Sequence, residues 1–320
     1  MITLVLKNIH RHLYGANNIH QYKHNNFILF VMCNVGYRLA EMLFVFILIF
    51  RNRLGIYPKP LSGHNKIIVS LTSFPKRIGT VWMVIDSMFH QKMRPDKICL
   101  YLSKEEFPMG KATLPKRLLR YEKLGLEIKF IEQNLKPHNK YFYAIQEFKD
   151  SYVITVDDDM YYHDNLISNL WKIHLKHPNN ICSNTINVIT FDDNYNFKPY
   201  EQWFRPHNEI TPSLLNLALG YDGVLYPTIL FEGRKEMFDV KLINKLSPKA
   251  DDLWLKALQL YYGVSVANGK YFCSGLNLPG AQTVSLMSSN CGISNQNDVQ
   301  WKALVEYFNL KTLCFKLIQK

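Results

Sequence analysis

The sequence Tyr152-Val-Ile-Thr-Val-Asp157-Asp158-Asp159 runs from apolar residues directly into three consecutive carboxylates. Val, Ile and Thr favour strands, and a short apolar run is typical of a strand buried inside a sheet. Side chains alternate along an extended chain, so we expect Asp157 and Asp159 to point to one side and Asp158 to the other. In α/β sheets, ligands bind beyond the carboxyl ends of the strands. This stretch therefore predicts a buried strand that ends at a ligand site.

Short apolar segments alternate with amphipathic ones on both sides of this stretch. Strands are expected at residues 66–71, 97–102 and 126–131, and helices at 78–89, 114–124, 140–148, 164–175, from 251 or 252 to just before 263, and at 299–308. Residues 184–222 are polar and aromatic, and we expect a loop-rich insertion that faces the substrate. This alternation predicts an α/β fold with a mixed, mostly parallel sheet flanked by helices.

The composition is that of a folded protein with a large core. Of the 320 residues, 48% are hydrophobic and 20% are charged, which excludes an intrinsically disordered chain. Six cysteines without a CxxC pair indicate reduced thiols in the cytosol rather than a zinc site or a disulfide scaffold. The sequence lacks GxGxxG, P-loop, GxSxG and HExxH motifs, so nothing in it supports the activities that these motifs mark.

The net charge of +12 favours anionic partners, and about half of the excess lies near the N-terminus. The first 60 residues hold seven Lys and Arg but a single acid, Glu41. No run of Lys and Arg of the nucleic-acid-binding type occurs, so nucleic acid is not expected as a partner. The excess therefore indicates nucleotide phosphates or an acidic membrane surface.

Residues 27–50 are the most apolar part of the chain, but Arg38 and Glu41 interrupt them. A spanning helix needs about 20 apolar residues with few charges. Two interpretations stay open: an interfacial or re-entrant anchor on an anionic leaflet, and a helical hairpin buried against the main domain. The anchor is preferred, because Arg38 and Glu41 stand three residues apart and can pair on one helix face.

The carboxylates after the strand at 152–156 suit a divalent metal ion. Mg²⁺ and Mn²⁺ prefer oxygen ligands and commonly take one or two carboxylates together with phosphate oxygens. We therefore expect Asp157 and Asp159 to hold Mn²⁺ or Mg²⁺. The alternative is a solvated acidic turn, which is common after strands.

A second acidic pair, Asp251 and Asp252, begins the helix that follows Ala250. Asp is a favoured N-cap, and acids suit the first turn of a helix, so the pair can be purely structural. The functional interpretation makes one of the two a general base that accepts a proton from a hydroxyl. The presence of the Asp157–Asp159 cluster favours this second interpretation.

Four other places in the sequence offer groups that can bind ligands. Residues 70–77 (SLTSFPKR) place hydroxyls, an aromatic ring and two cations at a strand end, where they can hold a base and its ribose or form a simple turn. Lys140 can neutralise a phosphate or simply lie on the solvated surface, and the Gly-bounded segment 220–227 can approach a sugar or form a plain hairpin. Trp203, in the 184–222 insertion, can offer a stacking face, although such rings are more often packing residues.

Taken in order, SLTSFPKRI, Lys140-Tyr141, VITVDDDMYY, GYDGVLYP and ADDLW resemble bacterial glycosyltransferases of the GT-A fold. These enzymes come from capsule and surface-polysaccharide gene clusters and are broadly similar to family 2. The resemblance covers residues 64 to about 310. It implies a nucleotide-diphosphate-sugar donor, a divalent metal ion, and sugar transfer to a hydroxyl of a glycan or lipid-linked acceptor.

The resemblance also assigns roles to residues. Asp157 and Asp159 match the metal-binding DxD pair, and Asp252, with Asp251 as the fallback, matches the catalytic base of inverting members. The implied donor-binding residues are Thr72, Ser73, Phe74, Arg77, Lys140, Asp158 and Gly223. The expected acceptor-side residues are Trp203, Asp222 and Trp254. Some GT-A enzymes add a C-terminal His to the metal, but the last His here is His207.

These expectations divide the chain into three parts: a basic, apolar segment at 1–63, a GT-A catalytic domain at 64–265, and a helical extension at 266–320 that completes the acceptor side. The expected location is the cytoplasm, peripheral to the inner face of the cell membrane, where a UDP-sugar meets a membrane-bound acceptor. Two other functions stay open: a metal-dependent nucleotidyl- or phosphotransferase, and a non-catalytic membrane-associated scaffold.

Overall fold

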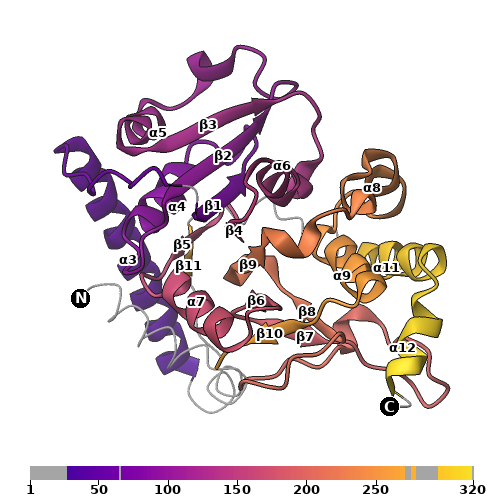
Figure 1. The fold of residues 1–320 in the computed structure, drawn as a ribbon. Helices are drawn as coiled ribbons and strands as arrows, with labels where there is room; N and C mark the ends of the chain where they lie inside the picture. Colours follow the sequence, from indigo (N-terminus) through magenta and orange to yellow (C-terminus); the bar gives the residue numbers. More distant parts are fainter. Residues whose placement is uncertain (1–26, 65, 271–274, 279–294, 319–320) are drawn as a thin grey trace. The chain divides into compact units, whose positions relative to one another are not determined.

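The computed structural model describes residues 27–64, 66–270, 275–278 and 295–318 (Figure 1). The chain divides into two compact units between Pro58 and Lys59. In the first unit, α3 is one continuous helix from Phe27 to Arg53, so the described residues show no hairpin there. No helix in the described part of the chain combines the length and apolar character needed to cross a bilayer.

The second unit is built on a seven-stranded sheet in the order β10-β6-β9-β4-β1-β2-β3. Its strands are β1 (Ile67–Thr72), β2 (Lys97–Ser103), β3 (Leu126–Ile131), β4 (Tyr152–Thr155), β6 (Ile181–Ser183), β9 (Val224–Pro227) and β10 (Val266–Asn268). Neighbouring strands are parallel except at β9, which runs antiparallel to both β4 and β6. The predicted mixed, mostly parallel α/β sheet is therefore confirmed.

The described residues of this unit also form α-helices, some of which pack directly on the sheet. They are α4 (Val81–Phe89), α5 (Lys116–Leu119), α6 (Asn139–Glu147), α7 (Leu166–Lys176), α8 (Val240–Leu246), α9 (Asp251–Tyr262), α11 (Gln296–Tyr307) and α12 (Leu310–Ile318). Helix α6 packs against β1, β2 and β4, whereas α7 packs against β6, β9 and β10. Figure 1 shows α9, α11 and α12 grouped beside one end of the sheet, and α9 contacts both of the others.

Two short antiparallel pairs accompany the main sheet. Strand β5 (Met160–Tyr162) pairs with β11 (Gly275–Asn277), and β7 (Ile186–Val188) pairs with β8 (Asn216–Ala218). The β7–β8 pair lies within the 184–222 insertion, which is therefore partly strand rather than loop alone. Strand β10 begins at residue 266, so the expected C-terminal extension first adds a strand to the central sheet.

The helix predicted at 114–124 is wrong in type and length. The α-helical part, α5, has four residues after Pro115, and residues 120–124 form a 3₁₀ helix that Gly125 ends at φ +107°. Leu118 and Tyr121, three residues apart, are both fully buried. Leu118 lies in α5 and Tyr121 in the 3₁₀ helix, and residues three apart share one face in both kinds of helix, so both side chains reach the core.

The topology brings several chain segments to one edge of the sheet. The parallel strands β1 to β4 all end there, and so does β6. Because β9 is antiparallel, it begins at this edge, with Val224 beside Thr155 of β4. The turn that precedes β9 therefore lies next to the carboxylates that follow β4.

Candidate active site

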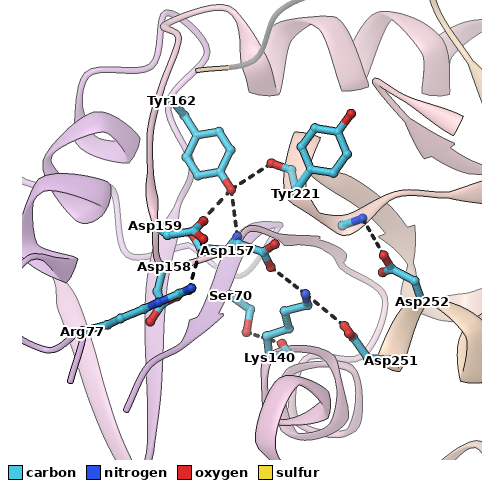
Figure 2. A network of polar contacts seen from close by, with 11 residues as sticks. Ser70, Arg77, Lys140, Asp157, Asp158, Asp159, Tyr162, Tyr221, Asp251 and Asp252 are labelled. Atoms are coloured by element: carbon cyan, nitrogen blue, oxygen red, sulfur yellow. Dashed lines mark hydrogen bonds and ion pairs between the residues drawn. The ribbon is translucent and has the colours of Figure 1, made fainter. Parts of the chain in front are cut away.

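Besides the 73–77 segment that follows β1, four segments of the chain bring predicted site residues to this edge. Figure 2 shows Asp157–Asp159 after β4, Lys140 in the first turn of α6, and Asp251 and Asp252 at the start of α9. The turn Gly220–Asp222 before β9 completes the group. The strand order alone brings these segments together, because they lie up to 112 residues apart in the sequence (140 to 252).

Asp158 is tied to the segment that follows β1. Its Oδ1 is 2.5 Å from Arg77 Nη1, and its Oδ2 accepts a hydrogen bond of 2.6 Å from Ser73 Oγ. Burial raises the pKa of Asp158, and Arg77 opposes that shift. Arg77 also lies 3.2 Å from Asp159 Oδ2 and 5.5 Å from the centre of the Phe74 ring. The 73–77 segment and the carboxylate cluster thus form one polar unit.

Lys140 bridges the carboxylates of the two acidic pairs. Its Nζ lies 2.7 Å from Asp157 Oδ1 and 2.9 Å from Asp251 Oδ2. Burial alone would lower the pKa of Lys140, but the surrounding carboxylates raise it well above its ordinary value. Ser70 Oγ donates a hydrogen bond to the Lys140 carbonyl and fixes the start of α6 on β1. Lys140 is therefore a permanently charged link between β4 and α9.

The two carboxylates that begin α9 differ in charge state. Burial would raise the pKa of Asp251, but the ammonium of Lys140 lowers it. Burial and the neighbouring charge of Asp251 raise the pKa of Asp252 to about 7. Asp251 is therefore a fixed anion, whereas Asp252 exchanges its proton near neutral pH, as a general base requires.

Gly220 holds Asp252 at close range. Its backbone N–H donates to Asp252 Oδ2 at 3.1 Å. A Cβ atom at this position would lie 3.0 Å from Asp252 Oδ1 and 3.1 Å from Lys140 Nζ. Gly220 is not among the glycines with positive φ, so a larger residue here would be limited by the space beside Asp252 and Lys140 and not by the backbone conformation.

Tyr162 and His138 are two site residues that the sequence did not reveal. The Tyr162 hydroxyl accepts a hydrogen bond of 2.8 Å from the Asp157 N–H and donates one of 3.1 Å to the Tyr221 carbonyl, as Figure 2 shows. It thereby joins the exit of β4 to the turn before β9. The quoted motif VITVDDDMYY contains Tyr162, but nothing in its spacing gives it this role.

His138 links the start of α6 to the loop before α9 and is fully buried. Its Nε2 lies 2.7 Å from the Ser247 carbonyl, which only accepts, so Nε2 carries the proton. Its Nδ1 therefore accepts from the Tyr141 hydroxyl at 3.0 Å. This imidazole supports the relative placement of Lys140 and Asp251.

The remaining predicted residues lie around this network or in the core. Thr72 donates to the Tyr101 carbonyl at 2.8 Å. Asp222 is buried; Thr185 donates to its carboxylate, and burial raises its pKa to about 6. Gly223 has a φ of +81°, and a Cβ there would lie 3.2 Å from the Leu166 side chain, so glycine is required at the entry to β9.

Trp203 and Trp254 lie in the hydrophobic core, so neither presents an exposed stacking face to an acceptor. Trp254 is fully buried, and its Nε1 donates to the Met237 carbonyl at 3.3 Å. The Trp203 ring packs edge-on against Trp301. Their burial follows from their size, because packing these rings between α9, α11 and the insertion removes a large apolar area from water.

The carboxylates that follow β4 suit a divalent cation whose other ligands are phosphate oxygens. Asp157 and Asp159 supply carboxylate oxygens, and two carboxylates plus phosphate oxygens form a common Mg²⁺ or Mn²⁺ site. Within the described ranges, no group of three or more His, Cys, Asp and Glu side chains forms a complete metal site by itself. Asp157 and Asp159 would hold such an ion, and its further ligands would be phosphate oxygens or water.

The fold and the site together define a class: an α/β protein with an acidic, lysine-bridged site at the carboxyl edge of its sheet. No protein-family model and no curated protein matches this chain. Among solved structures, TarS 1–349 of S. aureus in complex with UDP is similar, with a TM-score of 0.43 and 12% identity over 65% of this chain and 59% of that chain.

The complex of the same TarS fragment with UDP-GlcNAc has a TM-score of 0.47 and 12% identity over 78% of this chain and 66% of that one. The 4-diphosphocytidyl-2C-methyl-D-erythritol synthase of Anaerococcus prevotii DSM 20548 has a TM-score of 0.42 and 15% identity over 71% and 95%. This chain spans only 59% of the first structure's length, and all three TM-scores are below 0.5. No family or activity of this chain follows from them.

The buried His138 predicts a specific acid sensitivity of the fold. Burial lowers its pKa from 6.5 to about 4, so the unfolded chain takes up a proton between these pH values and the folded protein does not. Stability contributed by neutral His138 is therefore present above pH 6.5 and is lost as pH falls toward 4. The loss at pH 5 should be roughly 2 kcal/mol.

Urea unfolding at pH 7 and pH 5 measures this effect in wild type and in His138→Gln. The variant should be less stable at pH 7 but should lose less stability than wild type between the two pH values. His177→Gln, which replaces a half-buried imidazole at the end of α7, is the matched control and should follow wild type. If wild type and His138→Gln lost equal unfolding free energy between pH 7 and pH 5, the acid sensitivity could not be assigned to His138.

Proposed function

We propose that this protein is a metal-dependent glycosyltransferase that uses a nucleotide-diphosphate-sugar donor, with UDP-sugar as the first candidate. The acceptor would be a hydroxyl of a glycan or lipid-linked saccharide, as in the synthesis of a surface polysaccharide. The observation that carries the proposal is the Asp157–Lys140–Asp251 bridge. It sets a metal-type carboxylate cluster beside Asp252, a carboxylate that titrates near neutral pH.

Asp157 and Asp159 are the residues that would hold the metal ion on the donor diphosphate. When bound, a divalent cation there supplies Lewis-acid neutralisation of the charge that develops on the departing nucleoside diphosphate. Asp158 keeps the cluster attached to the 73–77 segment through Ser73 and Arg77. That segment, with Thr72 before it, is our candidate for the nucleotide-facing wall.

Asp252 is the proposed general base. It takes the proton of the acceptor hydroxyl as that oxygen bonds to the anomeric carbon, while the bond from this carbon to the diphosphate oxygen breaks. Direct attack assisted by one base inverts the anomeric configuration. Lys140 keeps Asp251 ionised, and the charge of Asp251 in turn helps to raise the pKa of Asp252 toward the working pH.

The first prediction for this function is metal-linked nucleotide binding, measured by calorimetric titration of UDP with Mn²⁺ and again with EDTA. Wild type should bind UDP, and EDTA should abolish the binding. Asp157→Asn and Asp159→Asn should each weaken it by about 100-fold or more, because loss of an outer-shell partner alone typically costs 10- to 100-fold. Asp193→Asn removes an equivalent charge from an exposed loop and is the matched control.

Unchanged affinity in both site variants, with circular dichroism spectra like that of wild type, would overturn the metal assignment. Absence of binding to UDP, GDP and CDP with Mn²⁺ present would instead favour a non-catalytic scaffold. Binding accompanied by turnover of a nucleoside triphosphate with pyrophosphate release, and none of a UDP-sugar, would favour a nucleotidyltransferase.

The second prediction concerns the base. Asp252→Asn should leave UDP affinity close to that of wild type and lower kcat by roughly 10²- to 10⁴-fold, the usual range for a general base. Because the base works deprotonated, wild-type kcat should rise with pH through about 7 and then level off. Normal turnover by Asp252→Asn would move the base elsewhere, to Asp251 first.

The third prediction tests the space at Gly220. Gly220→Ala would insert a methyl group between Asp252 and Lys140, so kcat should fall by about tenfold or more with little change in donor KM. Gly79→Ala is the matched control, because a Cβ at Gly79 meets nothing within 4 Å and its φ is not positive. Equal kcat values for the two variants would contradict a positioning role for Gly220.

A further inference from the structure

Helix α3 carries an apolar stripe along one face. We define the apolar stripe as Val35, Leu39, Met42, Leu43, Phe46 and Phe50, whose side chains are all 53–66% exposed. With 3.6 residues per turn, these positions fall within about 100° of the helix circumference, and they extend about 22 Å along its axis. A soluble protein rarely leaves a continuous apolar surface of this kind open to water.

Aromatic rings mark the C-terminal half of the stripe. The Phe46 and Phe50 rings stack, with their centres 6.3 Å apart and their planes at 13°, and both are more than half exposed. Exposed phenylalanines on an otherwise apolar helix face are typical of helices that lie in the boundary between lipid headgroups and acyl chains.

The positive charge of the N-terminal segment indicates what kind of surface binds the apolar stripe. Arg51 and Arg53 lie in the last turn of α3, and the first 60 residues hold seven basic residues against one acid. A basic segment is attracted to an anionic lipid surface, with each Lys or Arg near that surface contributing favourably. A second copy of this chain would instead bring a second excess of positive charge to the same face.

We propose that the apolar stripe of α3 docks on a bilayer surface that contains anionic lipid, with the helix axis in the plane of the membrane. Arg38 and Glu41 interrupt the apolar sequence of the helix, whereas a spanning segment carries few charges. The apolar stripe inserts its side chains at the headgroup level, and the basic residues contact lipid phosphates. This docking is independent of the proposed catalytic function and needs no donor or metal ion.

The test is co-sedimentation of the full-length protein with sucrose-loaded vesicles. Vesicles of phosphatidylcholine alone are compared with vesicles in which part of the lipid is phosphatidylglycerol. Wild type should partition onto the anionic vesicles and much less onto the neutral ones. Raising the salt concentration should weaken the binding, because salt screens the basic residues.

Two variants distinguish binding through the apolar stripe from non-specific binding through any exposed apolar side chain. Phe46→Glu should lower partitioning by about tenfold or more, because it removes a large apolar side chain and adds a repelled charge. Leu175→Glu is the matched control: it makes the same kind of change at a residue of α7 that is 67% exposed, and it should bind like wild type. Thermal unfolding of both variants confirms that they are folded.

Three results would overturn the proposal. Wild type that stays in the supernatant with anionic vesicles would show that the face does not dock on lipid. Equal losses in Phe46→Glu and Leu175→Glu would assign the binding to surfaces outside α3. A lipid-free wild-type dimer that Phe46→Glu converts to a monomer, together with weak vesicle binding, would assign the apolar stripe to a second copy of the chain.

Discussion

One buried ammonium group, that of Lys140, holds the proposed catalytic site together. It lies between Asp157, which follows β4, and Asp251, which begins α9. Removing one partner of a buried charge pair leaves the other charge uncompensated, which costs several kcal/mol. The two acidic pairs therefore depend on Lys140 for their position, and burial together with the charge of Asp251 raises the pKa of Asp252. The metal-type cluster and the candidate base form a single electrostatic unit.

The direction of β9 is the topological condition for this unit. Because β9 runs antiparallel between β4 and β6, the turn that precedes it reaches the edge where the parallel strands end. That turn supplies the Gly220 N–H to Asp252 and the Tyr221 carbonyl to Tyr162. A parallel β9 would place the same turn at the opposite edge of the sheet, and neither contact would form.

Local sequence patterns predicted most of the helices and strands, but they did not predict which side chains would contact one another. The apolar run before Asp157 and the acidic start of α9 appear where the sequence placed them. Three sets of contacts depend on the strand order, which no local pattern specifies. They are the ion pairs of Lys140 with both acids, the hydrogen bonds of His138, and those of the Tyr162 hydroxyl. The same limit explains Trp203 and Trp254, because a tryptophan in a binding wall and one in a core look alike in a sequence.

Diffraction data collected at the manganese absorption edge, from crystals grown with UDP and Mn²⁺, would locate both the metal ion and the nucleotide. We expect an anomalous peak coordinated by oxygens of Asp157 and Asp159 and by the diphosphate of UDP. We also expect Asp252 to stay free of the metal ion, next to Gly220. A peak remote from both carboxylates, or UDP bound away from the edge where β1 and β4 end, would contradict the proposed site.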